Sequence, residues 1–166
     1  MAGVDGGVAI CNLASLFRIE DRRMAEAQTH VFRVSLGPKL YRDFEILSAK
    51  SLYDLAELIV QVFGFDFDHA FGFYSKLSGH VFDSPVRYEL FADIGESDAG
   101  SVKRTRIAEA FPAVGAKMTF HFDYGDDWQF RIEAIGRNRK EPAAKYPRLL
   151  KAVGEAPEQY PDPDDE

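Results

Sequence analysis

Residues 29–64 read THVFRVSLGPKLYRDFEILSAKSLYDLAELIVQVFG, a stretch that passes from a strand-like to a helix-like hydrophobic pattern. Apolar and polar residues alternate in residues 29–36, which is typical of a strand with one buried face. Gly37 and Pro38 then supply a turn, and residues 40–47 form a second alternating run. We therefore expect two antiparallel strands joined as a hairpin.

A helix is predicted directly after this hairpin. Ser51 is followed three positions later by Asp54, a variant of the capping box that begins many helices, and Gly64 can end the helix. The apolar residues between these ends recur at helical spacing and are Leu52, Leu55, Leu58, Ile59, Val62 and Phe63. Because a stripe of this width can lie across a sheet, the domain is expected to open with a β-β-α unit.

The second half of the chain contains FHFDYGDDWQF at residues 120–130, where aromatic residues alternate with polar ones. The runs on either side of Gly125 predict a second hairpin, with a turn whose aspartates can bond backbone amides. Alternation places His121 and Asp123 on the face opposite the aromatic residues. We expect that aromatic face to fill the core with Phe120, Phe122, Tyr124, Trp128 and Phe130.

Shorter elements are predicted between the two hairpins. Residues 70–75 indicate a strand, and residues 79–85 indicate a further short strand. Residues 104–112 predict a short helix with Thr105 as its N-cap. The expected fold class is α+β: an antiparallel or mixed sheet with an opening β-β-α unit, two main helices packed on the sheet and a C-terminal aromatic hairpin.

The chain is predicted to divide into three segments. Residues 1–28 form an N-terminal arm with a helix-like run, residues 29–154 form the α+β domain, and residues 155–166 form an acidic tail that contains prolines. The tail carries six acidic residues and no basic one, so it accounts for most of the net charge of −7. Six cations lie just before it, in residues 137–151.

The cellular compartment is indicated by what the sequence lacks. The single cysteine, Cys11, cannot form an intramolecular disulfide. The N-terminus lacks the basic start and dense apolar run of a signal peptide, and no segment has the ~18–20 continuous apolar residues of a membrane span. We therefore expect a cytoplasmic protein that does not insert into a membrane.

Three segments carry motifs that occur together elsewhere: residues 40–65, residues 67–74 (FDHAFGFY) and residues 122–128 (FDYGDDW), followed by APEQYP at residues 156–161. Together they resemble the plasmid pRiA4b ORF-3-like family over residues 29–161. The most specific element is a D-[FY]-G-D-x-W motif carried here by Asp123, Tyr124, Gly125, Asp126 and Trp128. The resemblance implies an α+β fold with two helices packed on antiparallel strands, and it implies no established activity.

Some members of that family carry a resolvase-like label. A serine recombinase needs a nucleophilic serine among arginines and a basic helix-turn-helix unit. No such DNA-binding unit is visible, so the resolvase interpretation is rejected, although one serine has arginine neighbours in a helix-like run: Ser15 with Arg18, Arg22 and Arg23. The chain departs from the family pattern at Phe65 and Ala70, where Trp and Leu are usual, and both departures indicate packing differences.

The acidic turn is also a candidate metal or catalytic site. Carboxylate and imidazole groups can bind a divalent ion, and the candidate ligands are His121, Asp123, Asp126 and Asp127, with His69 brought in from another strand. A hydrolase or nuclease-like enzyme would place Asp123 and Asp126 in one cleft with His69 as acid or base. Turn chemistry alone accounts for Gly-Asp-Asp, so we expect a structural hairpin without a cofactor. We expect His69 to be a core or turn residue whose ring nitrogens have hydrogen-bond partners.

Binding of a protein partner is the function class that remains. Nucleic-acid binding would rest on the basic residues of 137–151 and on Lys103, Arg104 and Arg106, but no recognition motif accompanies them, and the acidic tail can neutralise the first group. The tail offers an anchor in Tyr160, and we expect it to pack on the domain. The sequence thus favours a non-catalytic module that binds or assembles with another macromolecule, with the hydrolase as the alternative.

Overall fold

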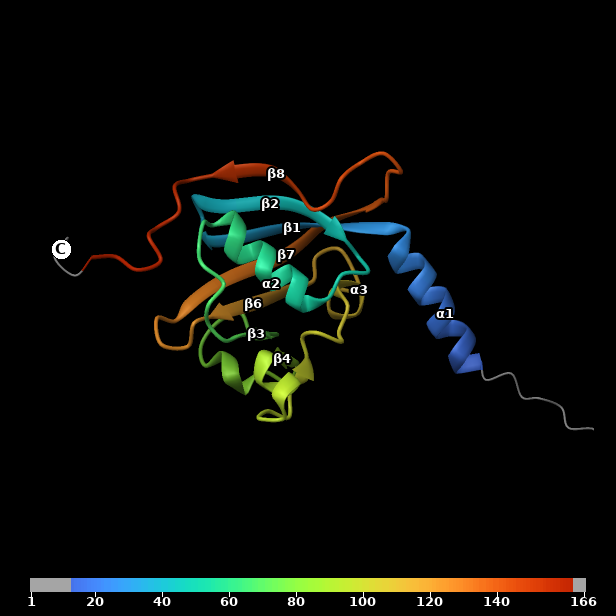
Figure 1. Ribbon diagram of the computed structural model, residues 1–166, viewed down its shortest axis with the longest axis horizontal. Coiled ribbons are helices and arrows are strands. Elements are labelled where there is room, and N and C mark those ends of the chain that lie inside the picture. Colours follow the sequence, from blue (N-terminus) through green and yellow to red (C-terminus); the bar gives the residue numbers. More distant parts are fainter. Residues whose placement is uncertain (1–12, 163–166) are drawn as a thin grey trace, which may run out of the picture.

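The computed structural model describes residues 13–162, which form a sheet of eight strands with helices packed against it (Figure 1). The strand order is β5-β4-β3-β6-β7-β1-β2-β8, and neighbouring strands are antiparallel except for the parallel pair β4 and β5. The α+β class with a mixed sheet is therefore confirmed. The strands are β1 (Gln28–Gly37), β2 (Leu40–Leu47), β3 (Phe71–Tyr74), β4 (Arg87–Glu89), β5 (Gly100–Ser101), β6 (Lys117–Phe122), β7 (Trp128–Arg139) and β8 (Arg148–Val153).

The described residues also form α-helices and two short 3₁₀-helices. No helix among them is long and apolar enough to cross a membrane. The helices are α1 (Leu13–Glu26), α2 (Leu52–Val62), η1 (Val81–Asp83), η2 (Leu90–Ile94) and α3 (Ile107–Ala110).

Helix α2 is the predicted helix of the opening β-β-α unit, and it lies across one face of the sheet (Figure 1). Its start is fixed by the expected capping box, since the Asp54 N–H donates to Ser51 Oγ at 3.1 Å and the Ser51 N–H donates to Asp54 Oδ2 at 2.9 Å. Such a cap contributes about 0.5–2 kcal/mol. The stripe of α2 packs on an aromatic core whose fully buried rings include Phe32, Phe44, Phe71, Phe73, Phe120 and Phe130.

The prediction of a short strand at residues 79–85 is wrong, because this segment contains the 3₁₀-helix η1. The hydroxyl and the N–H of Ser84 both donate to the carbonyl of Val81, at 2.6 and 3.0 Å, and these bonds close a tight turn. Local side-chain bonding of this kind competes with strand pairing. The turn positions Phe82 over the face of the sheet that α2 leaves uncovered, against Tyr74 at 5.3 Å between ring centroids.

The second predicted helix is only a single turn, α3, and Thr105 is not its N-cap. The Thr105 N–H donates to Ser101 O at 3.1 Å, so this residue belongs to the preceding turn. Arg106 is the N-cap instead, and its N–H donates to Glu109 Oε2 at 3.1 Å. An isolated bridge pairs Arg106 with Ser51, which holds the start of α3 beside the start of α2.

Four of the six cations in residues 137–151 lie on strands, whereas Lys140 and Lys145 lie in the connection between β7 and β8. Strand β7 continues to Arg139, and β8 adds an edge strand beside β2. Arg148 on β8 is paired with Glu45 of β2 at 2.8 Å between Nε and Oε2. Because part of this charge is neutralised within the sheet, the stretch is less available to phosphate than its composition suggests.

Helix α1 occupies the described part of the predicted N-terminal arm, and residues 1–12 of that arm lie outside the described residues. The helix leads into β1 and projects beyond the sheet (Figure 1). Ala25 is its buried residue, whereas Ser15, the serine of the rejected resolvase interpretation, is exposed. α1 is thus attached to the domain mainly at its C-terminal end.

Candidate functional site

The candidate site begins at the turn between β6 and β7, where Asp123 organises the backbone. Asp123 has a φ of +58°, and its Oδ1 accepts the N–H of Gly125 at 3.0 Å and of Asp126 at 3.2 Å. The Asp127 N–H donates to the carbonyl of Asp123 at 2.7 Å. Aspartate tolerates a positive φ better than most residues because its side chain bonds the local backbone. Asp123 thus bonds the backbone amides of the turn, which is the structural role that turn chemistry predicts.

Tyr124 lies on the other face from the one that strand alternation predicted. The alternation of β6 ends at Asp123, because a positive φ turns the chain out of the strand. Tyr124 therefore leaves the α2 side, and its hydroxyl lies 3.1 Å from the Tyr74 hydroxyl. The remaining predicted core residues face α2, with Trp128 only partly buried.

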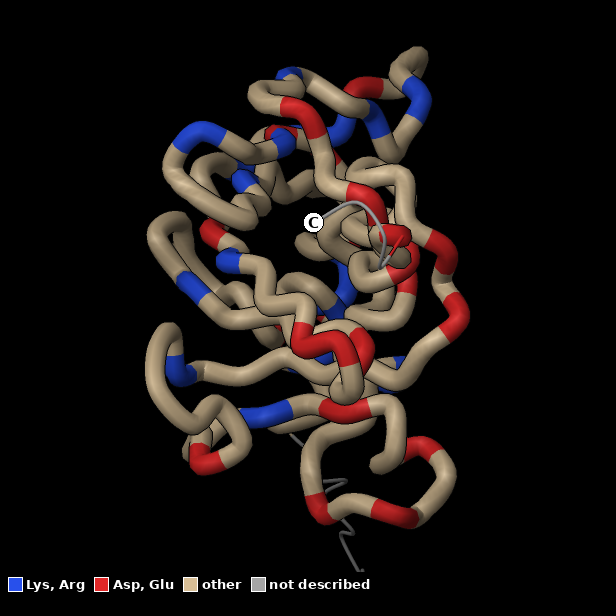
Figure 2. The backbone as a smooth tube through the Cα atoms, turned by 90° about the vertical axis from the view of Figure 1, so that its left-hand side faces the viewer, with Lys and Arg blue, Asp and Glu red and all other residues tan. Residues whose placement is uncertain are grey.

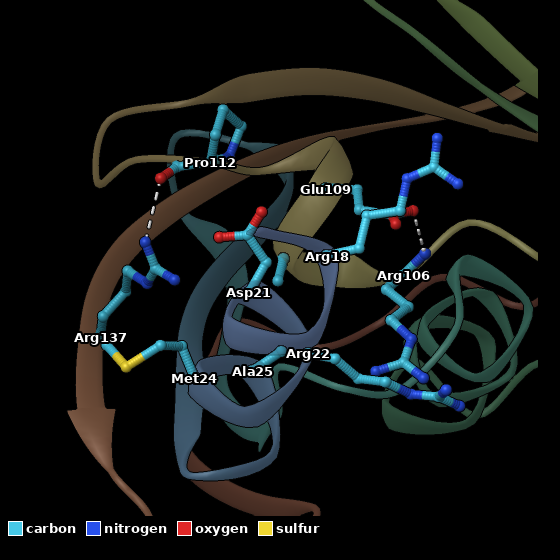
Figure 3. A pocket seen from close by; sticks show the side chains of 10 residues that line it. Arg18, Asp21, Arg22, Met24, Ala25, Arg106, Glu109, Pro112 and Arg137 are labelled. Carbon is cyan, nitrogen blue, oxygen red and sulfur yellow. Dashed lines mark hydrogen bonds between the residues drawn. The ribbon is translucent and has the colours of Figure 1, made fainter. Parts of the chain in front are cut away.

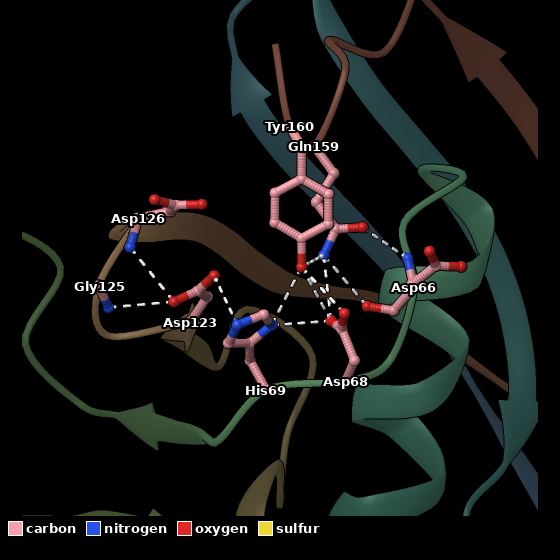
Figure 4. Close-up of polar contacts among 8 residues, drawn as sticks. All are labelled: Asp66, Asp68, His69, Asp123, Gly125, Asp126, Gln159 and Tyr160. Atoms are coloured by element: carbon pink, nitrogen blue, oxygen red, sulfur yellow. Dashed lines mark hydrogen bonds and ion pairs between the residues drawn. The ribbon is translucent and has the colours of Figure 1, made fainter. Parts of the chain in front are cut away.

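His69 links the loop before β3 to the hairpin turn (Figure 4). Its Nδ1 lies 2.7 Å from Asp68 Oδ1, and its Nε2 lies 3.4 Å from Asp123 Oδ2. The hydrogen bond to Asp68 and the charges of Asp123, Asp68 and Asp126 raise the pKa of His69, because carboxylates favour the imidazolium form. The side chain is 39% exposed, so His69 has partners as expected but lies at the surface and not in the core.

Gln159 fastens the C-terminal segment to the same loop. Its Oε1 accepts the Asp66 N–H at 2.6 Å, and its Nε2 donates to the Asp66 carbonyl at 3.2 Å (Figure 4). One side-chain amide thus satisfies both backbone groups of a single residue. Gln159 is buried although most of the neighbouring tail is exposed, so this glutamine is the residue that anchors the tail.

Tyr160 extends the same contact but remains half exposed. Its hydroxyl donates to Asp68 Oδ2 at 2.9 Å and lies 3.2 Å from His69 Nδ1. Desolvation, together with the bond to Asp68, raises the pKa of Tyr160 to about 12. Figure 2 shows acidic positions near the C-terminal end of the described chain. We call the assembly of Asp66, Asp68, His69, Asp123, Gln159 and Tyr160 the tail clamp.

His121 lies on the opposite face of the sheet, away from the tail clamp. Its side chain is 3% exposed and contacts the rings of Tyr74, Phe82 and Tyr124. Nε2 lies 2.7 Å from Asp127 Oδ1, but within residues 13–162 neither ring nitrogen has an aligned hydrogen-bond partner. Burial lowers the pKa of His121, because the desolvated ring resists protonation.

The same face carries a buried polar chain that sequence reasoning missed. The Tyr74 hydroxyl donates to Glu89 Oε1 at 2.9 Å, and the Ser97 hydroxyl donates to Glu89 Oε2. Burial raises the pKa of Tyr74. A Cβ added to Gly72 would lie 2.7 Å from the Tyr74 hydroxyl, so only glycine lets this ring lie over β3. The sequence signal was the Gly72 and Tyr74 pair within FDHAFGFY.

The predicted metal ligands separate into two pairs and do not form one group. His121 lies with Asp127, His69 lies with Asp123, and Asp126 is exposed at the turn. Within residues 13–162, no group of three or more His, Cys, Asp and Glu residues is arranged to hold a metal ion. Four cavities of about 590, 300, 220 and 400 Å³ in this part of the chain are lined by other residues. The catalytic and metal assignments therefore stay predictions.

The tail clamp joins three of the sequence motifs that the chain carries far apart. Asp68 and His69 come from FDHAFGFY, Asp123 from FDYGDDW, and Gln159 and Tyr160 from APEQYP. Gln159 was not predicted as a site residue, and its place within APEQYP was the only available signal. These motifs therefore meet in space as one structural contact.

Comparison with known proteins shows what this chain is similar to. A sequence profile for the plasmid pRiA4b ORF-3-like protein matches residues 27–160, and no curated protein matches the chain significantly. A crystal structure of a protein of unknown function from Methanosarcina mazei Go1 has a TM-score of 0.62 and 17% identity, covering 78% of this chain and 71% of that chain. That similarity shows a shared fold. Because the family profile includes the hairpin, the His69 loop and the Gln159 anchor, this chain belongs to the plasmid pRiA4b ORF-3-like family.

Proposed function

We propose that this protein is a non-catalytic assembly module that pairs with a second copy of itself through α1. The proposal rests on four residues on one side of the helix, Leu13, Leu16, Phe17 and Met24, which are 67%, 52%, 61% and 54% exposed. They recur at helical spacing, and we call them the α1 stripe. Ala25, the buried residue of α1, lies on another side.

A helix of this kind needs a partner for its apolar side. Isolated helices shorter than ~12–15 residues are marginal in water, and α1 spans 14 residues. Most helical stability in proteins comes from packing of an amphipathic face, and burial contributes about 25 cal/mol per Å² of apolar surface. Within residues 13–162, every side chain of the α1 stripe stays more than half exposed, so a second molecule is the natural source of that packing.

The charges on α1 favour a second copy over a strongly acidic or basic partner. The helix holds three arginines and three carboxylates, so it is neutral within a chain whose net charge is −7. A two-fold pair presents the same surface from both sides and must be self-complementary. Antiparallel copies meet this condition, because the acids of one helix, such as Glu20, can lie beside arginines of the other, such as Arg23.

The hydrolase alternative has less support. An enzyme needs its polar groups to converge in one concave pocket. Asp123 is engaged by turn amides and by His69, and His121 is enclosed by aromatic rings on the other face of the sheet. These contacts give the acidic hairpin a structural role that requires no substrate.

Native mass spectrometry tests the proposal, because one spectrum reports oligomeric mass and bound metal together. The wild-type protein is expected as a metal-free dimer. The double variant Leu16→Asp/Phe17→Asp is expected as a monomer, since a charge in a buried apolar contact is strongly unfavourable. Val114→Asp changes another exposed apolar residue and is the matched control, which should remain a dimer.

Two outcomes would contradict the proposal. A wild-type protein that stays monomeric at every concentration would remove the second copy as the partner. A stoichiometric divalent ion that disappears in Asp126→Ala would instead favour the hydrolase.

A further inference from the structure

The side of α1 that faces the domain lines a cavity of about 590 Å³ (Figure 3). The cavity lies between α1, α3 and β7, away from the tail clamp, and Met24 is the residue of the α1 stripe that also lines it. Pockets of roughly 300–1,000 Å³ are typical of sites for small molecules and cofactors. The volume is therefore large enough for a ligand the size of a nucleotide.

The cavity is basic in a protein that is otherwise acidic. Four arginines line it, Arg18 and Arg22 from α1 with Arg106 and Arg137 from the domain, and the carboxylates that line it are Asp21 and Glu109. The lining thus has a surplus of positive charge, although the net charge of the chain is −7. A concave site with one sign of charge concentrates ligands of the opposite sign.

Arg106 gives the strongest indication that this cavity suits an anion. Its Nη1 is buried, and within residues 13–162 it has no hydrogen-bond partner. A buried donor of a charged group is costly when it remains unpaired. The bridge to Ser51 and the bond to Glu109 fix the backbone of Arg106, and its side chain therefore starts from a defined position.

Within residues 13–162, Arg137 and Arg22 also lack close carboxylate partners. Arg137 donates to the Pro112 carbonyl at 2.9 Å and to Gln28 Oε1 at 2.9 Å, and both acceptors are neutral. Arg22 Nε lies 3.9 Å from Glu26 Oε1 on the exposed surface of α1, which is a weak ion pair. Figure 3 shows the side chains of Arg22 and Arg106 extending toward the same end of the cavity.

We propose that this cavity binds a phosphate-bearing small molecule of nucleotide size. Guanidinium groups recognise phosphate with paired, charge-assisted hydrogen bonds, and Arg22 and Arg106 would supply them from two sides. Met24, Ala25 and Pro112 offer apolar surface for the rest of the ligand. Because the arginines belong partly to α1 and partly to the domain, the ligand would also fasten α1 to the domain.

Isothermal titration calorimetry of the full chain with ATP, inorganic pyrophosphate and inorganic phosphate, each without metal, tests this site. ATP is expected to bind saturably with one site per chain. Arg22→Gln and Arg106→Gln should each weaken binding about tenfold or more, since each removes hydrogen bonds to a charged group. Tight binding of pyrophosphate or phosphate alone would show that the phosphate groups, and not the nucleoside, are recognised.

Arg104→Gln is the matched control, because Arg104 is an exposed arginine two positions from Arg106 that does not line the cavity. The proposal is overturned if none of the three probes binds at millimolar concentration, or if Arg104→Gln weakens binding as much as Arg22→Gln. Should Arg106→Gln fail to fold, Arg22→Gln decides the question, since its side chain lies on exposed α1. Leu16→Asp/Phe17→Asp should retain binding, which separates this site from dimer formation.

Discussion

The tail clamp and α1 lie at opposite ends of the described chain and differ in how they meet the domain. In the tail clamp, Gln159 satisfies both backbone groups of Asp66, and His69 lies between two carboxylates. In α1, apolar side chains are exposed, and two arginines of the helix line a cavity whose lining carries more arginines than carboxylates. The contrast teaches that the shared motifs hold the fold together, whereas both proposed contacts involve α1.

The largest change in the free energy of unfolding is expected when the tail clamp loses its buried amide. Gln159→Ala should lower the free energy of unfolding by about 1–3 kcal/mol, because it leaves the Asp66 N–H and carbonyl without their partner. Urea unfolding followed by circular dichroism would measure the change. Glu158→Ala alters the exposed neighbour and should be nearly neutral. Equal effects of the two variants would show that the tail does not depend on the buried amide.

A second prediction concerns His121, whose burial lowers its pKa from 6.5. Below pH 6.5 the unfolded chain takes up a proton that the folded ring resists, so the contribution of His121 to stability falls as pH falls. In His121→Gln, the free energy of unfolding should therefore fall less than in the wild type as the pH is lowered. Urea midpoints measured across acidic and neutral pH would show it, and an unchanged pH dependence would contradict the predicted direction.

His69, on the other face of the sheet from His121, should show the opposite pH dependence of stability. Its pKa is raised, so its stabilising contribution is complete below the unfolded value of 6.5 and is lost as pH rises through the folded pKa. The pKa of Asp68 is lowered by its bond to His69, so its contribution disappears only as pH falls below 3.8. The stability difference between wild type and His69→Gln should therefore be larger in mildly acid than in mildly alkaline solution, and proton NMR titration of His69 gives the pKa directly.

The smallest expected effect tests the independence of α1. In dilute, monomeric protein, Leu16→Asp/Phe17→Asp should change the free energy of unfolding of the domain by no more than about 0.5 kcal/mol, because exposed side chains far from other features contribute little. Thermal unfolding at low protein concentration is the measurement. A clear loss of stability in the monomer would mean that the α1 stripe packs against its own domain.

Much of the fold was predictable because it depends on neighbours in sequence. Ser51 and Asp54 begin α2, the β1 and β2 hairpin follows its alternation, and Asp123 caps its turn. Predictions failed where a local bond or a distant contact intervened: Ser84 folded the expected strand into η1, and β8 became an edge strand by pairing with β2. The sequence of β8, RLLKAV, does not alternate apolar and polar residues, so it lacks the periodic signal on which strand predictions rest.

The sequence by itself determined the fold class, the position of α2 and the membership of the family, because periodicity, capping residues and motifs are local properties of the chain. Only the tertiary structure decided that His69 and His121 lie on different sides of the sheet, that Gln159 anchors the tail, and that four arginines surround one cavity. These relations join residues far apart in the chain, and the folding of the backbone through space, including the turn at Asp123, is what brings them together.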